Sequence, residues 1–215
     1  MKIIVLAACL ALFMLVACQM PATPLLDSSI PKQASAVAQS KLVAAEPTSD
    51  GFAQTLELQG IHFRITCPND SSLNTLTIEP AGLEVDNTVL TRTVDGTVIG
   101  AEVADLDTDG SPEIYVYVQS AGSGAYGSLV AYAANQRKSL SEIYLPELIE
   151  TSEAAQGYMG HDAFAVVENT FVRRFPVYRE GDMNAKPTGG MRQLQYKLVA
   201  GEASWLLQLD KVLSY

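Results

Sequence analysis

From Phe52 onward, the chain alternates apolar and polar side chains in short runs, which is the period of a β-strand with one buried face. Ile61, Phe63 and Ile65 share one face of such a run, and the residues between them are polar. The same alternation recurs in the runs 193–198 and 205–210. Because a half-apolar strand has to bury that face against a second layer, the pattern predicts an all-β domain.

Turn sequences separate these runs at short intervals. Asp95-Gly96 is typical of the type I′ turn of a β-hairpin, and Glu168-Asn169 and Ala200–Ala203 predict two further hairpins. The run Ile114–Val118 is apolar on both faces, so we expect it at the centre of a two-layer structure. The spacing predicts an antiparallel β-sandwich or flattened barrel of about eight to ten short strands. Residues 145–160 allow one helical turn.

The first segment resembles an export signal. One Lys precedes an apolar run that ends at Ala17 and is too short to span a bilayer. The run closes with Leu15-Val16-Ala17-Cys18, which resembles the bacterial lipobox, in which the cysteine becomes lipidated. We therefore predict a lipoprotein signal peptide over 1–17 and a lipidated Cys18 that anchors the chain without spanning the membrane. Gln19 resembles the residue that directs lipoproteins to the outer membrane. The alternative is ordinary secretion into the periplasm.

A low-complexity stretch follows the lipobox. Residues 19–51 contain four prolines and no aromatic residue, so they bury too little apolar area to offset the entropy of ordering. We expect a flexible linker over 18–52 and one domain over 53–215. Cys67 is the thiol that remains in this domain, and we expect it to be a small buried residue at a strand end. An intermolecular disulfide is the alternative.

Charge and rare residues exclude several functions. The chain has 24 acidic and 14 basic residues, a net charge of -10, which argues against binding nucleic acid. Two His and three scattered Cys are too few for a Cys/His zinc site. Between Arg92 and Arg137 lie six acidic residues and no Lys or Arg. We expect these acids to form a rim around the loop described next and to steer a cationic partner.

The Gly-rich segment Ala121–Gly127 lies between two predicted strands. Its three glycines permit a tight projecting loop, which carries the hydroxyls of Ser123 and Tyr126. A tyrosine is a rigid amphipathic anchor, so the loop suits recognition. The alternative is a plain connection whose tyrosine packs on its own domain. A nucleophilic serine is disfavoured because the G-x-S-x-G elbow needs glycine where Ala121 stands.

A second motif is Asp105-Leu106-Asp107-Thr108-Asp109-Gly110. Alternating carboxylates ahead of a glycine can wrap Ca²⁺ with oxygen ligands, so Asp105, Asp107 and Asp109 are candidate calcium ligands. The motif is similar to the calcium turn of integrin-type propeller repeats, although a single copy argues against a propeller. The alternative is a strand connection made of turn-forming residues.

The residues Ser123-Gly124-Ala125-Tyr126 resemble the Ser-Gly-x-Tyr motif of bacterial lysozyme inhibitors. Their wider context is most similar to the periplasmic inhibitors of invertebrate-type lysozyme, and we place the similarity over about 52–213. Three segments carry this context: Ala104–Glu113, Tyr158–Asp162 and Asn184–Gly190.

The resemblance implies a β-sandwich whose loops plug the lysozyme cleft. Ser123, Gly124 and Tyr126 would form the inhibitory loop, with the two hydroxyls meeting the catalytic carboxylates of the enzyme. Lys186 and Thr188 are the suggested second contact loop, although their order differs from that of related inhibitors. The protein would then be an inhibitor and not an enzyme, and it would require no cofactor. It would be located at the periplasmic face of the outer membrane, where it would protect peptidoglycan against lysozyme.

Two further expectations accompany this hypothesis. The resemblance makes a homodimer plausible. The rival function, from another class, is a calcium-dependent envelope adhesion or binding module that uses the Asp105–Asp109 turn. Sensitivity to a chelator distinguishes the two functions, because a plug of hydroxyls has no direct need of metal.

Overall fold

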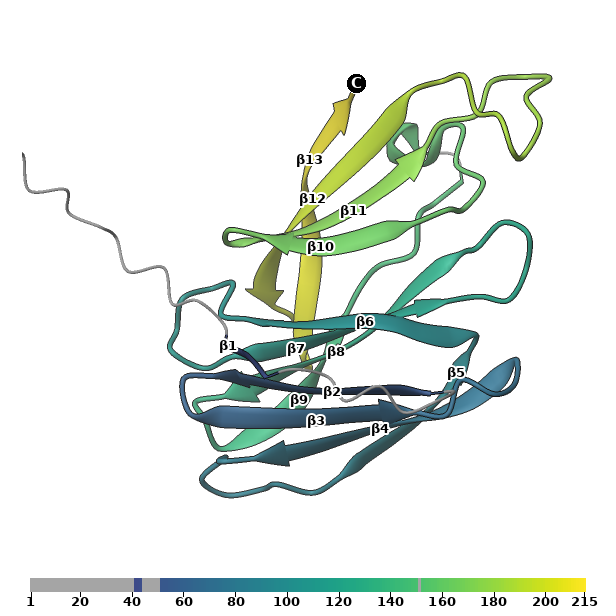
Figure 1. Cartoon of the computed structure of the whole chain (residues 1–215). Helices are drawn as coiled ribbons and strands as arrows, with labels where there is room; N and C mark the ends of the chain where they lie inside the picture. Colours follow the sequence, from purple (N-terminus) through teal and green to yellow (C-terminus); the bar gives the residue numbers. More distant parts are fainter. Residues whose placement is uncertain (1–40, 44–50, 151) are drawn as a thin grey trace, which may run out of the picture. The chain divides into compact units, whose positions relative to one another are not determined.

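The computed structural model describes residues 41–43, 51–150 and 152–215. Most of them lie in strands, so the predicted all-β class is confirmed (Figure 1). The predicted signal peptide and Cys18 lie outside the described residues. Lys41–Val43, inside the predicted linker, form a short strand. The strands are β1 (Lys41–Val43), β2 (Phe52–Leu58), β3 (Ile61–Cys67), β4 (Leu73–Ala81), β5 (Leu90–Asp95), β6 (Thr97–Ala104), β7 (Glu113–Gln119), β8 (Gly127–Asn135), β9 (Ser139–Tyr144), β10 (Ala163–Val167), β11 (Thr170–Pro176), β12 (Met191–Ala200) and β13 (Trp205–Ser214).

These strands form two sheets, and they outnumber the eight to ten expected. The five-stranded sheet has the order β1-β2-β3-β4-β5, with antiparallel neighbours throughout. The eight-stranded sheet has the order β10-β11-β12-β13-β9-β8-β7-β6 and is antiparallel except for β13 and β9, which pair in parallel. It curls until β10 meets β6, where the Val166 amide donates to Glu102 at 2.6 Å. The expected sandwich and the expected barrel are therefore both present in the fold.

Strand β7 is buried on both faces, as its apolar run predicted. Ile114, Val116 and Val118 belong to the core between the five-stranded sheet and strands β6–β8. Tyr115 and Tyr117 point the other way, into the core that the curled eight-stranded sheet encloses. The strand thus separates two hydrophobic cores, and the loop that follows it starts from a rigid support.

Strand β3 confirms the alternation from which the fold class was inferred. Ile61, Phe63 and Ile65 are fully buried, whereas His62 and Arg64 are exposed. Cys67 ends the strand, buried and free, as expected. The packing of this face against residues of β6–β8 supplies the hydrophobic free energy that the two-residue period implied.

Two of the three predicted hairpins are confirmed. Glu168 and Asn169 connect β10 to β11 in a two-residue turn, and Glu168 has a φ of 54°. A four-residue loop connects β12 to β13, which pair from Ala200 and Trp205 onward.

The hairpin predicted at Asp95-Gly96 is wrong. Strand β5 pairs with β4, whereas β6 pairs with β7, so the chain passes here from one sheet to the other. Gly96 has a φ of 118°, and a Cβ at this position would overlap the carbonyl oxygen of Gln119. The glycine is therefore required by a corner between the sheets, not by a type I′ turn.

The segment between β9 and β10 contains the one helical turn that the sequence allowed. It is a 3₁₀ turn, Glu153–Ala155, whose N-cap is Ser152; the Ser152 hydroxyl accepts a hydrogen bond from the Ala155 amide. Among the described residues there is no helix of the length and apolarity needed to cross a bilayer.

Candidate functional site

The Ser-Gly-Ala-Tyr loop, residues 120–126, connects the end of β7 to the start of β8. Ser120 and Tyr126 close its base: the Ser120 amide donates to the Tyr126 carbonyl at 2.9 Å, and the Tyr126 amide donates to the Ser120 hydroxyl at 3.0 Å. At the tip, the Ala125 amide donates to the carbonyl of Gly122 at 2.9 Å. These bonds give the loop a defined base on a buried strand.

The two hydroxyls of this loop are available to a partner. Ser123 is exposed, and the side chain of Tyr126 is half exposed, at 50%. Within the part of the chain that the structure describes, neither hydroxyl makes a hydrogen bond, whereas those of Tyr158 and Tyr178 do. The Tyr126 ring rests edge-on against Tyr158, with ring centroids 5.7 Å apart. The Tyr126 ring therefore packs on its own domain, as the alternative of a plain connection predicted, yet the hydroxyl of the side chain stays free.

Two segments distant in sequence brace the loop. The His161 amide donates to the Gly124 carbonyl at 2.7 Å, and the Asn184 side-chain amide donates to the Ser123 carbonyl at 2.8 Å. The imidazole of His161 and the side-chain carbonyl of Asn184 lie 3.0 Å apart, so the two segments also contact each other. A Cβ on Gly160 would overlap the Gly124 carbonyl oxygen. The three loops thus form one surface.

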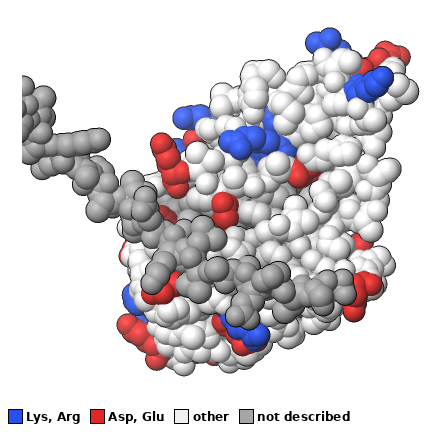
Figure 2. All heavy atoms as spheres, in the orientation of Figure 1, with Lys and Arg blue, Asp and Glu red and all other residues white. Residues whose placement is uncertain are grey.

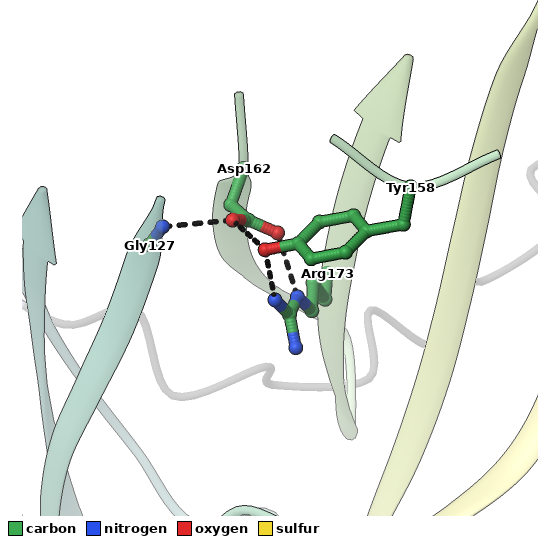
Figure 3. Close-up of polar contacts among 4 residues, drawn as sticks. All are labelled: Gly127, Tyr158, Asp162 and Arg173. Atoms are coloured by element: carbon green, nitrogen blue, oxygen red, sulfur yellow. Dashed lines mark hydrogen bonds and ion pairs between the residues drawn. The ribbon is translucent and has the colours of Figure 1, made fainter. Parts of the chain in front are cut away.

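A polar network built around the buried Asp162 and Arg173 contacts Gly127, the first residue after the loop (Figure 3). Asp162 and Arg173 form an ion pair with a 2.7 Å contact, and Tyr158 donates to Asp162 at 2.6 Å. The Gly127 amide, at the first residue after the loop, also donates to Asp162, at 2.7 Å. Burial raises the pKa of Tyr158, as does its hydrogen bond to Asp162, so this hydroxyl stays protonated.

The structure brings the suggested second contact loop next to the first. Lys186 is exposed, and its amide donates to the Met183 carbonyl in a turn. The Thr188 hydroxyl donates to Asp182 at 2.9 Å, so its proton is already in use and the group faces a partner only as an acceptor. Asn184, which sequence reasoning did not single out, makes the actual contact with Ser123.

The expected acidic rim around the loop is wrong. The Asp105–Asp109 turn lies before β7, and the Ser-Gly-Ala-Tyr loop lies after it. The seven residues of β7 separate the turn from the loop by roughly 20 Å. Glu102 accepts a hydrogen bond from Tyr117 in the middle of the sheet. Of the six acids, only Asp95 lies at the end of β7 from which the loop starts, because it precedes the corner that packs against Gln119. Figure 2 shows Lys and Arg over β11 and β12 instead.

The acidic turn has a geometry that could hold a cation. Asp105, Asp107 and Asp109 each offer a carboxylate oxygen, and these oxygens lie within 4.8 Å of one another. Such hard oxygen donors are the ligands that Ca²⁺ takes. Backbone amides of the turn also donate to Asp105, as the alternative of a plain connection requires. Burial, with the added charge of the three aspartates, raises the pKa of nearby Glu113 to about 8.

Residues 83–169 match the model of a protein family described as periplasmic lysozyme inhibitor of I-type lysozyme. The resemblance inferred from the sequence is thereby confirmed. The lysozyme-inhibitor match runs from the segment before β5 to the turn after β10. It includes the Ser-Gly-Ala-Tyr loop, the acidic turn and Tyr158–Asp162, but it ends before the loop that holds Lys186. The match is thus narrower than the 52–213 expected. Comparison with curated proteins and with solved structures finds no significant match.

Sequence reasoning missed the residues that brace the loop, among them Arg173 and Asn184. One signal was present for Arg173: it occupies the apolar face of β11, between the buried Phe171 and Phe175. A charged side chain at such a position needs a buried partner. The sequence gives no comparable signal for Asn184.

Proposed function

We propose that this protein inhibits I-type lysozyme by placing the Ser-Gly-Ala-Tyr loop in the active-site cleft of the enzyme. The family match supports the class of partner. The observation that carries the mechanism is the loop itself: it is braced by two other segments, yet its two hydroxyls are free. A braced loop with unpaired donors loses little conformational entropy when it binds.

The chemistry of a glycosidase cleft suits these donors. Such a cleft holds a protonated acid and an ionised carboxylate, and a hydroxyl can donate to the ionised one. Hydrogen bonds to charged groups contribute about 1.5–3 kcal/mol each. Gly124 allows this presentation, because a Cβ there would lie 2.5 Å from the Tyr126 ring. The motif spacing thus sets both hydroxyls on one projection.

A cell-wall turbidity assay tests the proposal with invertebrate-, chicken- and goose-type lysozymes. We expect inhibition of the invertebrate type, and Ser123→Ala and Tyr126→Phe should each weaken it by about 10- to 100-fold. Ser128→Ala and Tyr144→Phe are matched controls, since both residues are exposed and lie outside the loop. The absence of inhibition of any class at micromolar protein would reject the function. Full inhibition by the double loop variant would reject the loop.

We also propose that the protein works at the cell envelope, protecting peptidoglycan from its anchored position. The matching family is described as periplasmic. Lipidation of Cys18 would tether the domain at the periplasmic face of the outer membrane, with the linker giving it reach. Metabolic labelling with a palmitate analogue tests the anchor: label should appear on the wild-type protein and vanish from Cys18→Ala. Label that persists on Cys18→Ala contradicts lipidation at this residue.

Homodimer formation remains part of the proposal. Strand β13 pairs with β9 only through Trp205 and Leu206, so along the described residues its later part has one unpaired edge. This part also exposes Leu209, Val212 and Leu213, and an exposed apolar strand edge is a ready surface for a second copy. Size-exclusion chromatography with light scattering should give twice the monomer mass; a monomer at micromolar concentration contradicts it.

The acidic turn supports a second candidate function, a calcium-dependent envelope adhesion or binding module. Its three clustered carboxylates are the supporting observation. Titration calorimetry with Ca²⁺ should give heat that disappears in Asp107→Asn. Because the turn and the loop lie at opposite ends of β7, a chelator should abolish adhesion and leave lysozyme inhibition intact. No heat at millimolar Ca²⁺ removes this candidate.

A further inference from the structure

The Asp162–Arg173 pair lies in a core that is otherwise apolar. The side chains are 0% and 8% exposed, inside the curled sheet that otherwise encloses aromatic and aliphatic residues. Replacing a buried ion pair by packed apolar residues is often neutral or stabilising. Stability alone therefore does not account for this pair, and its specific contacts need a separate explanation.

Those contacts lead to the loop. Asp162 uses one carboxylate oxygen for Arg173, and the other accepts from the Gly127 amide at 2.7 Å and from the Tyr158 hydroxyl at 2.6 Å. Gly127 is the first residue after the loop, and a Cβ on it would lie 2.6 Å from the Cβ of Asp162. The carboxylate thus approaches the backbone so closely that only glycine fits there.

The other side of the network holds the surface on which Tyr126 rests. Arg173 donates to the Tyr158 hydroxyl at 2.7 Å, and its guanidinium carbon lies 5.0 Å from the centre of the Tyr158 ring. The same ring packs edge-on against Phe175, with centroids 4.7 Å apart, and against Tyr126 on its exposed side. Fixing Tyr158 therefore fixes the packing surface of the exposed tyrosine.

We propose that Asp162, Arg173 and Tyr158 are positioning residues that hold the Ser-Gly-Ala-Tyr loop in its binding conformation before the partner arrives. The inference rests on the proposed function. A loop that contains Gly122 and Gly124 has many accessible conformations when it is unsupported. Affinity falls in proportion to the fraction of molecules in the competent conformation, so loosening the network should lower the association rate for lysozyme.

The test combines binding kinetics with amide hydrogen exchange on the purified protein. Tyr158→Phe removes one hydroxyl and keeps the ring, and Asp162→Asn removes the charge at nearly constant shape. We expect each to slow association with I-type lysozyme by about tenfold, with a smaller change in dissociation. The Gly127 amide should exchange at least about tenfold faster, while amides of the five-stranded sheet keep their protection.

Tyr115→Phe is the matched control. It removes a hydroxyl that is buried in the same core and bonded to Glu113, away from the loop. Association and Gly127 exchange that change no more in the two network variants than in Tyr115→Phe would overturn the inference, because the network would then be merely structural. If wild-type protein fails to inhibit lysozyme, the proposed function fails, and exchange at Gly127 still decides whether the network holds the loop.

Discussion

Glu113 is a carboxylate whose ionisation is strongly altered by its surroundings. It is buried, and its carboxylate accepts the Leu106 amide at 2.8 Å. Burial and the nearby aspartates raise its pKa to about 8, from 4.5 for a free side chain. The folded protein therefore binds a proton at Glu113 more tightly than the unfolded chain does. This proton stabilises the fold below pH 4.5, and its contribution is lost as the pH rises through about 8.

This shift predicts the behaviour of Glu113→Gln. Each unit of pKa difference corresponds to about 1.4 kcal/mol, so the wild-type protein should lose a few kcal/mol of unfolding free energy between about pH 5 and about pH 9. The neutral amide keeps an acceptor for the Leu106 amide and has no proton to lose. The variant should therefore lose less stability over this range, as measured by urea denaturation with a chelator present. Equal slopes in both proteins would contradict the assignment.

Residue-level features differ in how far the sequence reveals them. Ser123 and Tyr126 could be singled out because the dense glycines around them are a local signal. The role of Arg173 could not be assigned, because its partner Asp162 lies on a different segment and only the folded sheet brings them together. An inward-facing charge shows that a partner exists but does not identify it.

At the scale of elements, the two Gly- or Asn-containing turns show what local chemistry determines. Glu168-Asn169 and Asp95-Gly96 both place a positive φ between two strands. Only the first is a hairpin, because the strands around Gly96 pair in different sheets. Turn residues thus predict that the chain bends, whereas pairing depends on which apolar faces are buried together. The alternation predicted the strands, and it could not predict their order.

The corner at Gly96 gives a prediction about stability. In Gly96→Ala, a methyl group would overlap the Gln119 carbonyl in addition to straining a φ of 118°. We expect a loss of about 2–4 kcal/mol in unfolding free energy. Gly181→Ala is the control, since Gly181 has a φ of 86° and no atom within 4 Å of the added Cβ. It isolates backbone strain, and its cost should be about 1 kcal/mol. Equal losses in the two variants would show that the overlap is relieved cheaply.

At the scale of the whole molecule, the acidic turn and the proposed binding loop are separated. The net charge of -10 would attract a cationic partner, but the acidic turn lies roughly 20 Å from the loop. The screening length is about 8 Å at physiological ionic strength, so only acids at the loop's end act strongly on a docking enzyme. Of the six acids between Arg92 and Arg137, Asp95 is the one in that place.

Asp95→Asn should therefore slow association with lysozyme more than Asp109→Asn does. We expect a reduction of about two- to threefold for the first and almost none for the second, as measured by stopped-flow at low and physiological salt. High salt should remove the difference between them. A larger effect of Asp109→Asn would contradict this prediction and would indicate that the acidic turn lies close to the docked enzyme.

The place of β13 in its sheet has a consequence for the order of assembly. Strands β6–β9 carry the Ser-Gly-Ala-Tyr loop. Strands β10–β12 carry Arg173, and β10 begins directly after Asp162. β13 alone joins these two groups by strand pairing among the described residues, and it is synthesised after both. Long-range pairing of this kind is slow, because the intervening chain must close first. The proposed binding loop and the segments that brace it should then be among the last parts to mature, so newly made chains would not bind the proposed partner until they have folded completely.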